Sequence, residues 1–92
     1  MTQSSIFRTK LLELPLGSFC ILYKNKRYIT TIQIYSNNKI IKLYAEELGG
    51  NDIVSGNYFT TIKGGLLKPC EMSDAKVIDF VVNLEIIEIN KW

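Results

Sequence analysis

The chain has 92 residues, of which 47% are hydrophobic and 22% are charged, and its formal net charge is +2. This length suits one compact domain, so we expect a single domain over residues 1–92 with residues 1–4 disordered. The chain has no histidine, which excludes imidazole catalysis, Ser/His/Asp and Cys/His nucleophile pairs, and zinc sites that need an imidazole. Its two cysteines cannot form an all-thiolate zinc site, and we expect neither a metal nor a cofactor.

The hydrophobic segments are short. None approaches the roughly 20 residues of a membrane-spanning helix, and residues 1–10 lack the pattern of a signal peptide. We therefore expect a cytoplasmic protein with no membrane partner and with reduced cysteines. Residues 1–42 carry seven basic side chains and one acidic side chain, whereas residues 43–92 carry four basic and eight acidic ones. Such asymmetry is compatible with a face that binds polyanions.

The first segment has the apolar spacing of a helix. Phe7, Leu11 and Leu14 recur at i, i+4 and i+7, which predicts a helix over residues 4–14 that stops at Pro15. Residues 18–23, "SFCILY", are aromatic and β-branched and predict a strand. The polar residues "KNKR" follow as a break.

The next two strands have the clearest β pattern. Residues 27–35 alternate with period 2, and residues 40–47, "IIKLYAEE", read as the return strand. Between them, residues 36–39 contain two asparagines, which tolerate the left-handed backbone of tight turns.

Glycines mark the later turns. Residues 48–52, "LGGND", predict a turn with positive φ, and residues 53–62 resume a strand. Gly56 within that strand predicts a bulge or the close approach of another backbone. Gly64 and Gly65 predict a hairpin into a short strand that Pro69 ends.

The second helix begins with strong signals. Ser73 is a natural N-cap, Asp74 complements the helix dipole, and Val77, Phe80, Val81 and Leu84 form one apolar face. Residues 84–90 fit either a helix or a strand, and we favour a short strand or an extended tail. The order predicts an α+β fold in which a short N-terminal helix and a C-terminal helix pack on one face of a mostly antiparallel sheet of about five strands, arranged as a meander or a curled half-barrel.

The turn at residues 48–52 and the strand after it offer polar contacts. Asn51, Asp52, Asn57 and Tyr58 carry hydrogen-bonding groups that a loop and its neighbouring strand can present. Our first hypothesis is therefore a non-enzymatic module that uses these residues to bind a protein or a small ligand, with a homo-oligomer left open.

A basic hairpin suggests a different class of partner. Lys24, Lys26 and Arg27 lie between Tyr23 and Tyr28, so charge for phosphates and rings for base stacking occur together. Because the net charge is modest, nucleic acid is the least favoured of the three hypotheses.

The stretches "KLYAEELGGNDIVSGNYF", "LLKPCEM" and "KVIDF" resemble a group of small bacterial proteins that share a YAEELGG turn and an LKPCEMP-like corner. The resemblance covers residues 14–80, and some of those proteins are labelled peptide methionine sulfoxide reductases. It implies a thiol reductase with Cys70 as nucleophile, which is our alternative hypothesis. Cys20 could resolve the reaction only if the two Cα atoms lay within roughly 7 Å. The reductase motifs Gly-Cys-Phe-Trp and Arg-Tyr-Cys do not occur here, and Cys70 also suits a packed corner.

Overall fold

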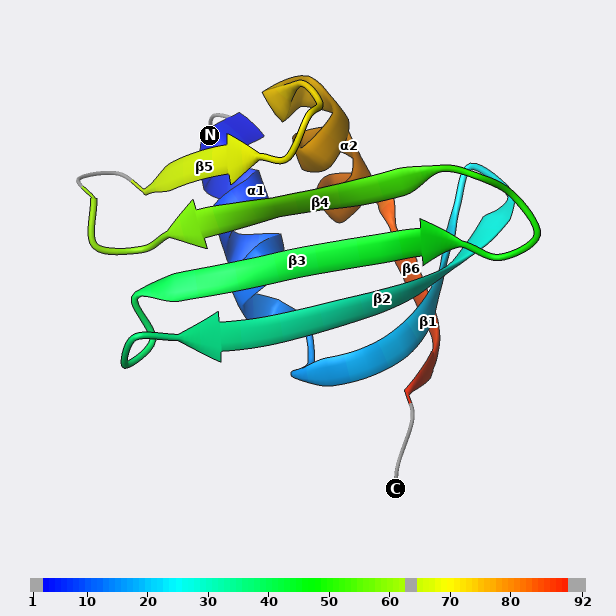
Figure 1. The fold of residues 1–92 in the computed structure, drawn as a ribbon, viewed down its shortest axis with the longest axis horizontal. Helices are drawn as coiled ribbons and strands as arrows, with labels where there is room; N and C mark the ends of the chain where they lie inside the picture. Colours follow the sequence, from blue (N-terminus) through cyan, green and yellow to red (C-terminus); the bar gives the residue numbers. More distant parts are fainter. Residues whose placement is uncertain (1–2, 63–64, 90–92) are drawn as a thin grey trace.

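The fold is described from a computed structural model that covers residues 3–62 and 65–89 (Figure 1). The elements are α1 (Gln3–Glu13), β1 (Gly17–Tyr23), β2 (Lys26–Tyr35), β3 (Ile40–Glu47), β4 (Ile53–Phe59), β5 (Leu66–Pro69), α2 (Asp74–Asn83) and β6 (Glu85–Ile89). Of the segment 1–4 that we expected to be disordered, residues 3–4 belong to α1, and residues 1–2 lie outside the described residues.

The strands form one open, antiparallel sheet in the order β5-β4-β3-β2-β1-β6. Both helices lie on the same side of this sheet (Figure 1), so the predicted α+β fold is confirmed. The sheet has six strands rather than about five, because residues 85–89 form a strand that pairs with β1, which is the first of the two alternatives favoured for this segment. Strands β1 to β5 follow one another as a meander, β6 joins at the β1 edge after α2, and the sheet does not close into a barrel.

The core lies between the helices and the inner face of the sheet. Phe7 and Leu11 of α1 are each 3% exposed, which confirms the helical spacing read from the sequence. From α2, Val77, Phe80 and Val81 are buried against the sheet. Burial of each such side chain stabilises the fold by about 1.5–3 kcal/mol. The outward-pointing side chains of β1 to β5, which we call the outer face, are not covered by any element in the described part of the chain.

The turns follow the residues that tolerate positive φ. Lys24 and Asn25 form a two-residue turn with φ of 50° and 64°, the backbone of a type I′ hairpin. A Cβ on Gly56 would lie 3.1 Å from backbone atoms of β5, which confirms the close approach expected there. Strand β4 ends at Phe59, earlier than expected, because Phe59 lies opposite Ile40, the first residue of β3. The next residue, Thr60, bonds to the turn before β3, where its hydroxyl donates to the Asn38 carbonyl at 3.0 Å.

Helix α2 begins and ends as its sequence indicates. The Ser73 hydroxyl accepts a hydrogen bond from the backbone N–H of Lys76 at 3.2 Å, as an N-cap should. At the other end, Leu84 is extended and its N–H donates to the carbonyl of Phe80, so the chain leaves the helix directly into β6. No helix within residues 3–62 and 65–89 is long and apolar enough to cross a membrane.

Candidate functional site

The β1–β2 hairpin carries two lysines beside two buried tyrosines. Tyr23 is 8% exposed and Tyr28 is 2% exposed, and both rings pack edge-on against Phe80, with centroids 5.0 and 5.1 Å from it. Such contacts contribute about 0.5–1.5 kcal/mol beyond area burial and hold the rings in one orientation. The hydroxyl groups therefore point to fixed places beside α2, while Lys24 and Lys26 stay exposed.

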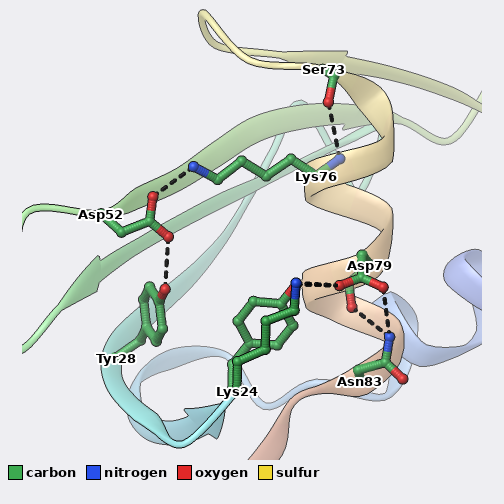
Figure 2. Close-up of polar contacts among 8 residues, drawn as sticks. Lys24, Tyr28, Asp52, Ser73, Lys76, Asp79 and Asn83 are labelled. Carbon is green, nitrogen blue, oxygen red and sulfur yellow. Dashed lines mark hydrogen bonds and ion pairs between the residues drawn. The ribbon is translucent and has the colours of Figure 1, made fainter.

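Asp52, in the turn before β4, connects the hairpin to α2 (Figure 2). One carboxylate oxygen accepts from the Tyr28 hydroxyl at 2.7 Å, and the other accepts from the Lys76 ammonium at 2.6 Å. The bonds from Lys76 and from Tyr28 lower the pKa of Asp52 below its ordinary value. Burial and the bond to Asp52 raise the pKa of Tyr28, so the phenol stays protonated and donates.

A second carboxylate, that of Asp79, lies on α2 about one turn after Lys76. Asp79 accepts from the Tyr23 hydroxyl and from the Asn83 amide, the latter at 2.9 Å, and its carboxylate lies 3.8 Å from the Lys24 ammonium. Burial, and then the hydrogen bond to Asp79, raise the pKa of Tyr23 to about 12. Figure 2 shows Lys24 directed towards Asp79.

Together these groups surround a pocket of about 560 Å³ between the hairpin, the β3–β4 turn and α2, which we call the α2 pocket. Its lining consists of Tyr23, Lys24, Lys26, Tyr28, Asp52, Ser73, Ala75, Lys76 and Asp79. Three lysines against two aspartates leave a positive lining. Each aspartate already accepts at least two hydrogen bonds, whereas Lys26 forms no ion pair with any residue that the structure describes.

Of the four residues predicted to contact a protein or a small ligand, only Asp52 lies in the α2 pocket. Asp52 lies in the α2 pocket with the hairpin residues, but Asn51 is an exposed turn residue outside the lining. Asn57 points to the outer face, where it pairs with Lys42. Tyr58 is 5% exposed in the core, where its hydroxyl accepts from the Arg8 guanidinium at 2.9 Å.

The hairpin residues proposed for nucleic acid are also divided. The rings of Tyr23 and Tyr28 are buried, so they offer no free face to a base. Arg27 is exposed but lies outside the pocket lining, opposite Leu22 in the β1–β2 pair.

The two cysteines lie far apart and both are free thiols. Cys70 is exposed just after β5, and its N–H donates to the Ser55 carbonyl of β4. Cys20 lies on β1, which β2, β3 and β4 separate from β5, so about 19 Å of sheet lies between them at roughly 4.8 Å a strand. The condition for Cys20 as resolving thiol is therefore not met within one chain.

Sequence reasoning missed Lys76 and Asp79 as site residues. They are spaced i, i+3 on α2, and Asn83 follows at i+4 from Asp79, so helical periodicity places all three on one side. That signal was readable in the sequence, but which strands this side of the helix would meet depends on the packing of the whole chain.

The pocket residues do not form a metal site. Among residues 3–62 and 65–89, no group of three or more His, Cys, Asp and Glu side chains is placed to hold a metal ion.

Comparisons with protein families, with curated proteins and with solved structures found no match to the chain. The resemblance to the YAEELGG group therefore stays a prediction, and the site must be interpreted from its own chemistry.

Proposed function

We propose that the protein is a non-enzymatic binding module that takes a small anionic ligand, carrying a carboxylate or phosphate group, into the α2 pocket. The observation that carries the proposal is the convergence of Lys24, Lys26 and Lys76 on one cavity from two separate elements of the fold. An ammonium group binds anions as a compact point charge with three donors, and lysine is a common phosphate ligand.

The hydrogen bonds already formed in the pocket favour an anion over a cation. Asp52 and Asp79 are occupied by tyrosine hydroxyls, lysines and an amide, so a cationic ligand would have to displace those donors. Lys26 by contrast has its ammonium available, and Ser73 at the rim marks the positive end of the α2 dipole. An anion would pair with Lys26 without breaking the hydrogen bonds that Asp52 and Asp79 accept.

A titration followed by NMR tests this proposal. Isotopically labelled protein is titrated with inorganic phosphate, citrate and a nucleoside monophosphate as probes, and saturable amide shifts are expected in residues 24–28, Asp52 and residues 73–76. Lys26→Gln should weaken binding about tenfold, since it removes one charge-assisted hydrogen bond of about 1.5 kcal/mol. Lys10→Gln, which removes the same charge from α1, is the matched control. Absence of saturable shifts with all three probes, or equal weakening by Lys10→Gln, would contradict the proposal.

A thiol reductase acting through Cys70 is the second candidate. The exposure of Cys70 at the β5–α2 corner supports it, since a nucleophilic thiol must be accessible. Because Cys20 lies on β1, which three strands separate from β5, such an enzyme would need an external thiol to resolve the sulfenic acid or disulfide formed on Cys70. Turnover of a methionine sulfoxide substrate that disappears in Cys70→Ser would favour this candidate over the binding module.

A further inference from the structure

The outer face brings three aromatic side chains onto an uncovered surface. The register aligns Tyr35 with Ile40 and Ile40 with Phe59, in one row across β2, β3 and β4. Tyr44 lies on the same face of β3, four residues along from Ile40. Tyr35 is 45% exposed and Tyr44 is 39% exposed, and both helices lie on the opposite side of the sheet (Figure 1). The rings of Tyr35 and Tyr44 are therefore accessible, unlike those of Tyr23 and Tyr28, and Phe59 is half-buried.

Polar and basic side chains lie between these rings. The register places Gln33, Lys42, Asn57 and Lys68 in one row across β2 to β5, between the row that holds Tyr35 and the row that holds Tyr44. Lys39, in the adjacent turn, is also exposed. Within the described residues, none of these three lysines forms an ion pair.

Charge on the outer face is polarised along the strands. Its outward positions from the Ser18–Thr31–Tyr44–Ser55 row to Leu66 carry lysines and no acidic side chain. Glu46 lies in the next row of β3 and accepts from the Tyr44 hydroxyl at 3.2 Å, and two further acidic side chains, Glu85 and Glu88, lie on β6 at the neighbouring edge. In the half that contains the exposed aromatic rings, the rows with Tyr35, Phe59 and the lysines are therefore positive, and Tyr44 lies at the border with the acidic end.

We propose that this half of the outer face binds single-stranded nucleic acid, with bases stacked on Tyr35, Phe59 and Tyr44 and phosphates near Lys39, Lys42 and Lys68. Stacking tolerates any base, whereas lysines follow the backbone, and their alternation on one open sheet suits this polymer. Asn57 can hydrogen-bond base edges exposed in a single strand, as can the amide N–H groups of Gln33, whose oxygen accepts from the Tyr35 hydroxyl at 2.7 Å. A second copy of the chain would bring like charges together across the face, which disfavours self-association there.

Fluorescence anisotropy with a labelled single-stranded oligothymidine and an oligouridine tests this proposal across a salt series. Three neutralised phosphates predict a slope of log K against log salt of about −2. Lys42→Gln should reduce the magnitude of that slope by about 0.7. Tyr35→Leu, at an exposed strand end where folding does not depend on the ring, should weaken binding at least about fivefold through lost stacking.

Lys10→Gln on α1 and Lys26→Gln in the α2 pocket are the matched charge controls, and both should leave the affinity within about twofold because neither lysine lies on the outer face. Lys26→Gln also separates this inference from the proposed function, since it should affect the anion probes alone. Absence of binding at low salt, or equal weakening by Lys10→Gln and Lys42→Gln, would overturn the proposal. A dimer in sedimentation that fails to bind either oligonucleotide would assign the face to a second copy instead.

Discussion

The Tyr28 hydroxyl donates to the Asp52 carboxylate at 2.7 Å, and Lys76 of α2 binds the other oxygen of the same carboxylate at 2.6 Å. One side chain thus joins the β1–β2 hairpin, the β3–β4 turn and the C-terminal helix. Because two donors favour the charged form, the pKa of Asp52 is lower in the folded chain than in the unfolded chain. This contribution to stability is complete above about pH 4 and is lost as pH falls through the folded pKa.

Asp52→Asn should therefore destabilise the protein more at neutral pH than in acid. We expect a difference on the order of 1 kcal/mol at pH 7, because the pair is partly exposed, and a smaller difference as the pH falls below about 4. Urea unfolding of both proteins over a pH series measures it. A difference that is constant across the series would contradict the role assigned to the charged carboxylate.

The Tyr23 phenol should titrate late. Burial and the hydrogen bond to Asp79 raise its pKa to about 12, so its contribution to stability is full below about pH 10 and is lost as pH rises through the folded pKa. Ultraviolet absorbance of tyrosinate should show late titration by Tyr28, whose pKa is also raised, and by Tyr23, and Tyr23→Phe should remove the Tyr23 component. Asp79→Asn should shift that component to lower pH, whereas Asp74→Asn, on the same helix without this hydrogen bond, should not. A late absorbance change that is as large in Tyr23→Phe as in the unchanged protein, and that is unmoved by Asp79→Asn, would refute the assignment.

Replacing Thr30 by an apolar residue of the same shape should stabilise the protein. Its side chain is fully buried, and its hydroxyl has no hydrogen-bond partner among the residues described. Because an unpaired buried polar group costs about 1–3 kcal/mol, Thr30→Val should stabilise the protein by about 1 kcal/mol and raise Tm by about 4–8 °C. Thr31→Val is the control, since the Thr31 hydroxyl lies 3.1 Å from that of Ser18 and loses a bond. Thermal unfolding that ranks Thr31→Val above Thr30→Val would show that the Thr30 hydroxyl is satisfied.

The two thiols should not pair within one chain. With about 19 Å of sheet between β1 and β5, a Cys20–Cys70 bridge would require the sheet to unfold. After treatment with a mild oxidant, mass spectrometry of the alkylated monomer should show both thiols modified separately. An intramolecular disulfide in the folded monomer would mean that the strand order is wrong.

Local pattern was enough to predict most elements. The alternation of β2, the helical spacing of Phe7 and Leu11, and the Ser73 cap each depend on nearby residues, and each prediction is confirmed. The end of β4 was placed too late because it depends on the register with β3, which begins at Ile40 opposite Phe59 and therefore gives later residues no partner in that strand.

The candidate site could be predicted only in part, because it too depends on contacts between segments that are distant in sequence. The sequence placed Lys24 and Lys26 on one hairpin and Asp52 in another turn, but as parts of separate hypotheses. Only the packing of α2 brings Lys76 to Asp52 and makes these segments one pocket. Likewise, burial of Tyr58 and of the hairpin tyrosines depends on where the helices lie, which period-2 alternation alone does not specify.

Among the glycines in the described part of the chain, Gly65 should be the one where an added Cβ costs the most stability. Its φ is +81°, and a Cβ there would collide with the Tyr58 hydroxyl, which accepts the hydrogen bond from Arg8. Gly65→Ala should therefore cost about 2 kcal/mol or more in urea unfolding, combining backbone strain with displacement of the ring.

Gly49→Ala is the matched control, because Gly49 has a similar φ of +77° but nothing within 4 Å of the added Cβ, so it carries the backbone cost alone. Tyr58→Phe in the Gly65→Ala background should recover part of the loss, since it removes the atom that collides. Equal costs for the two glycine substitutions, with no coupling between Gly65→Ala and Tyr58→Phe, would show that Gly65 does not lie against Tyr58.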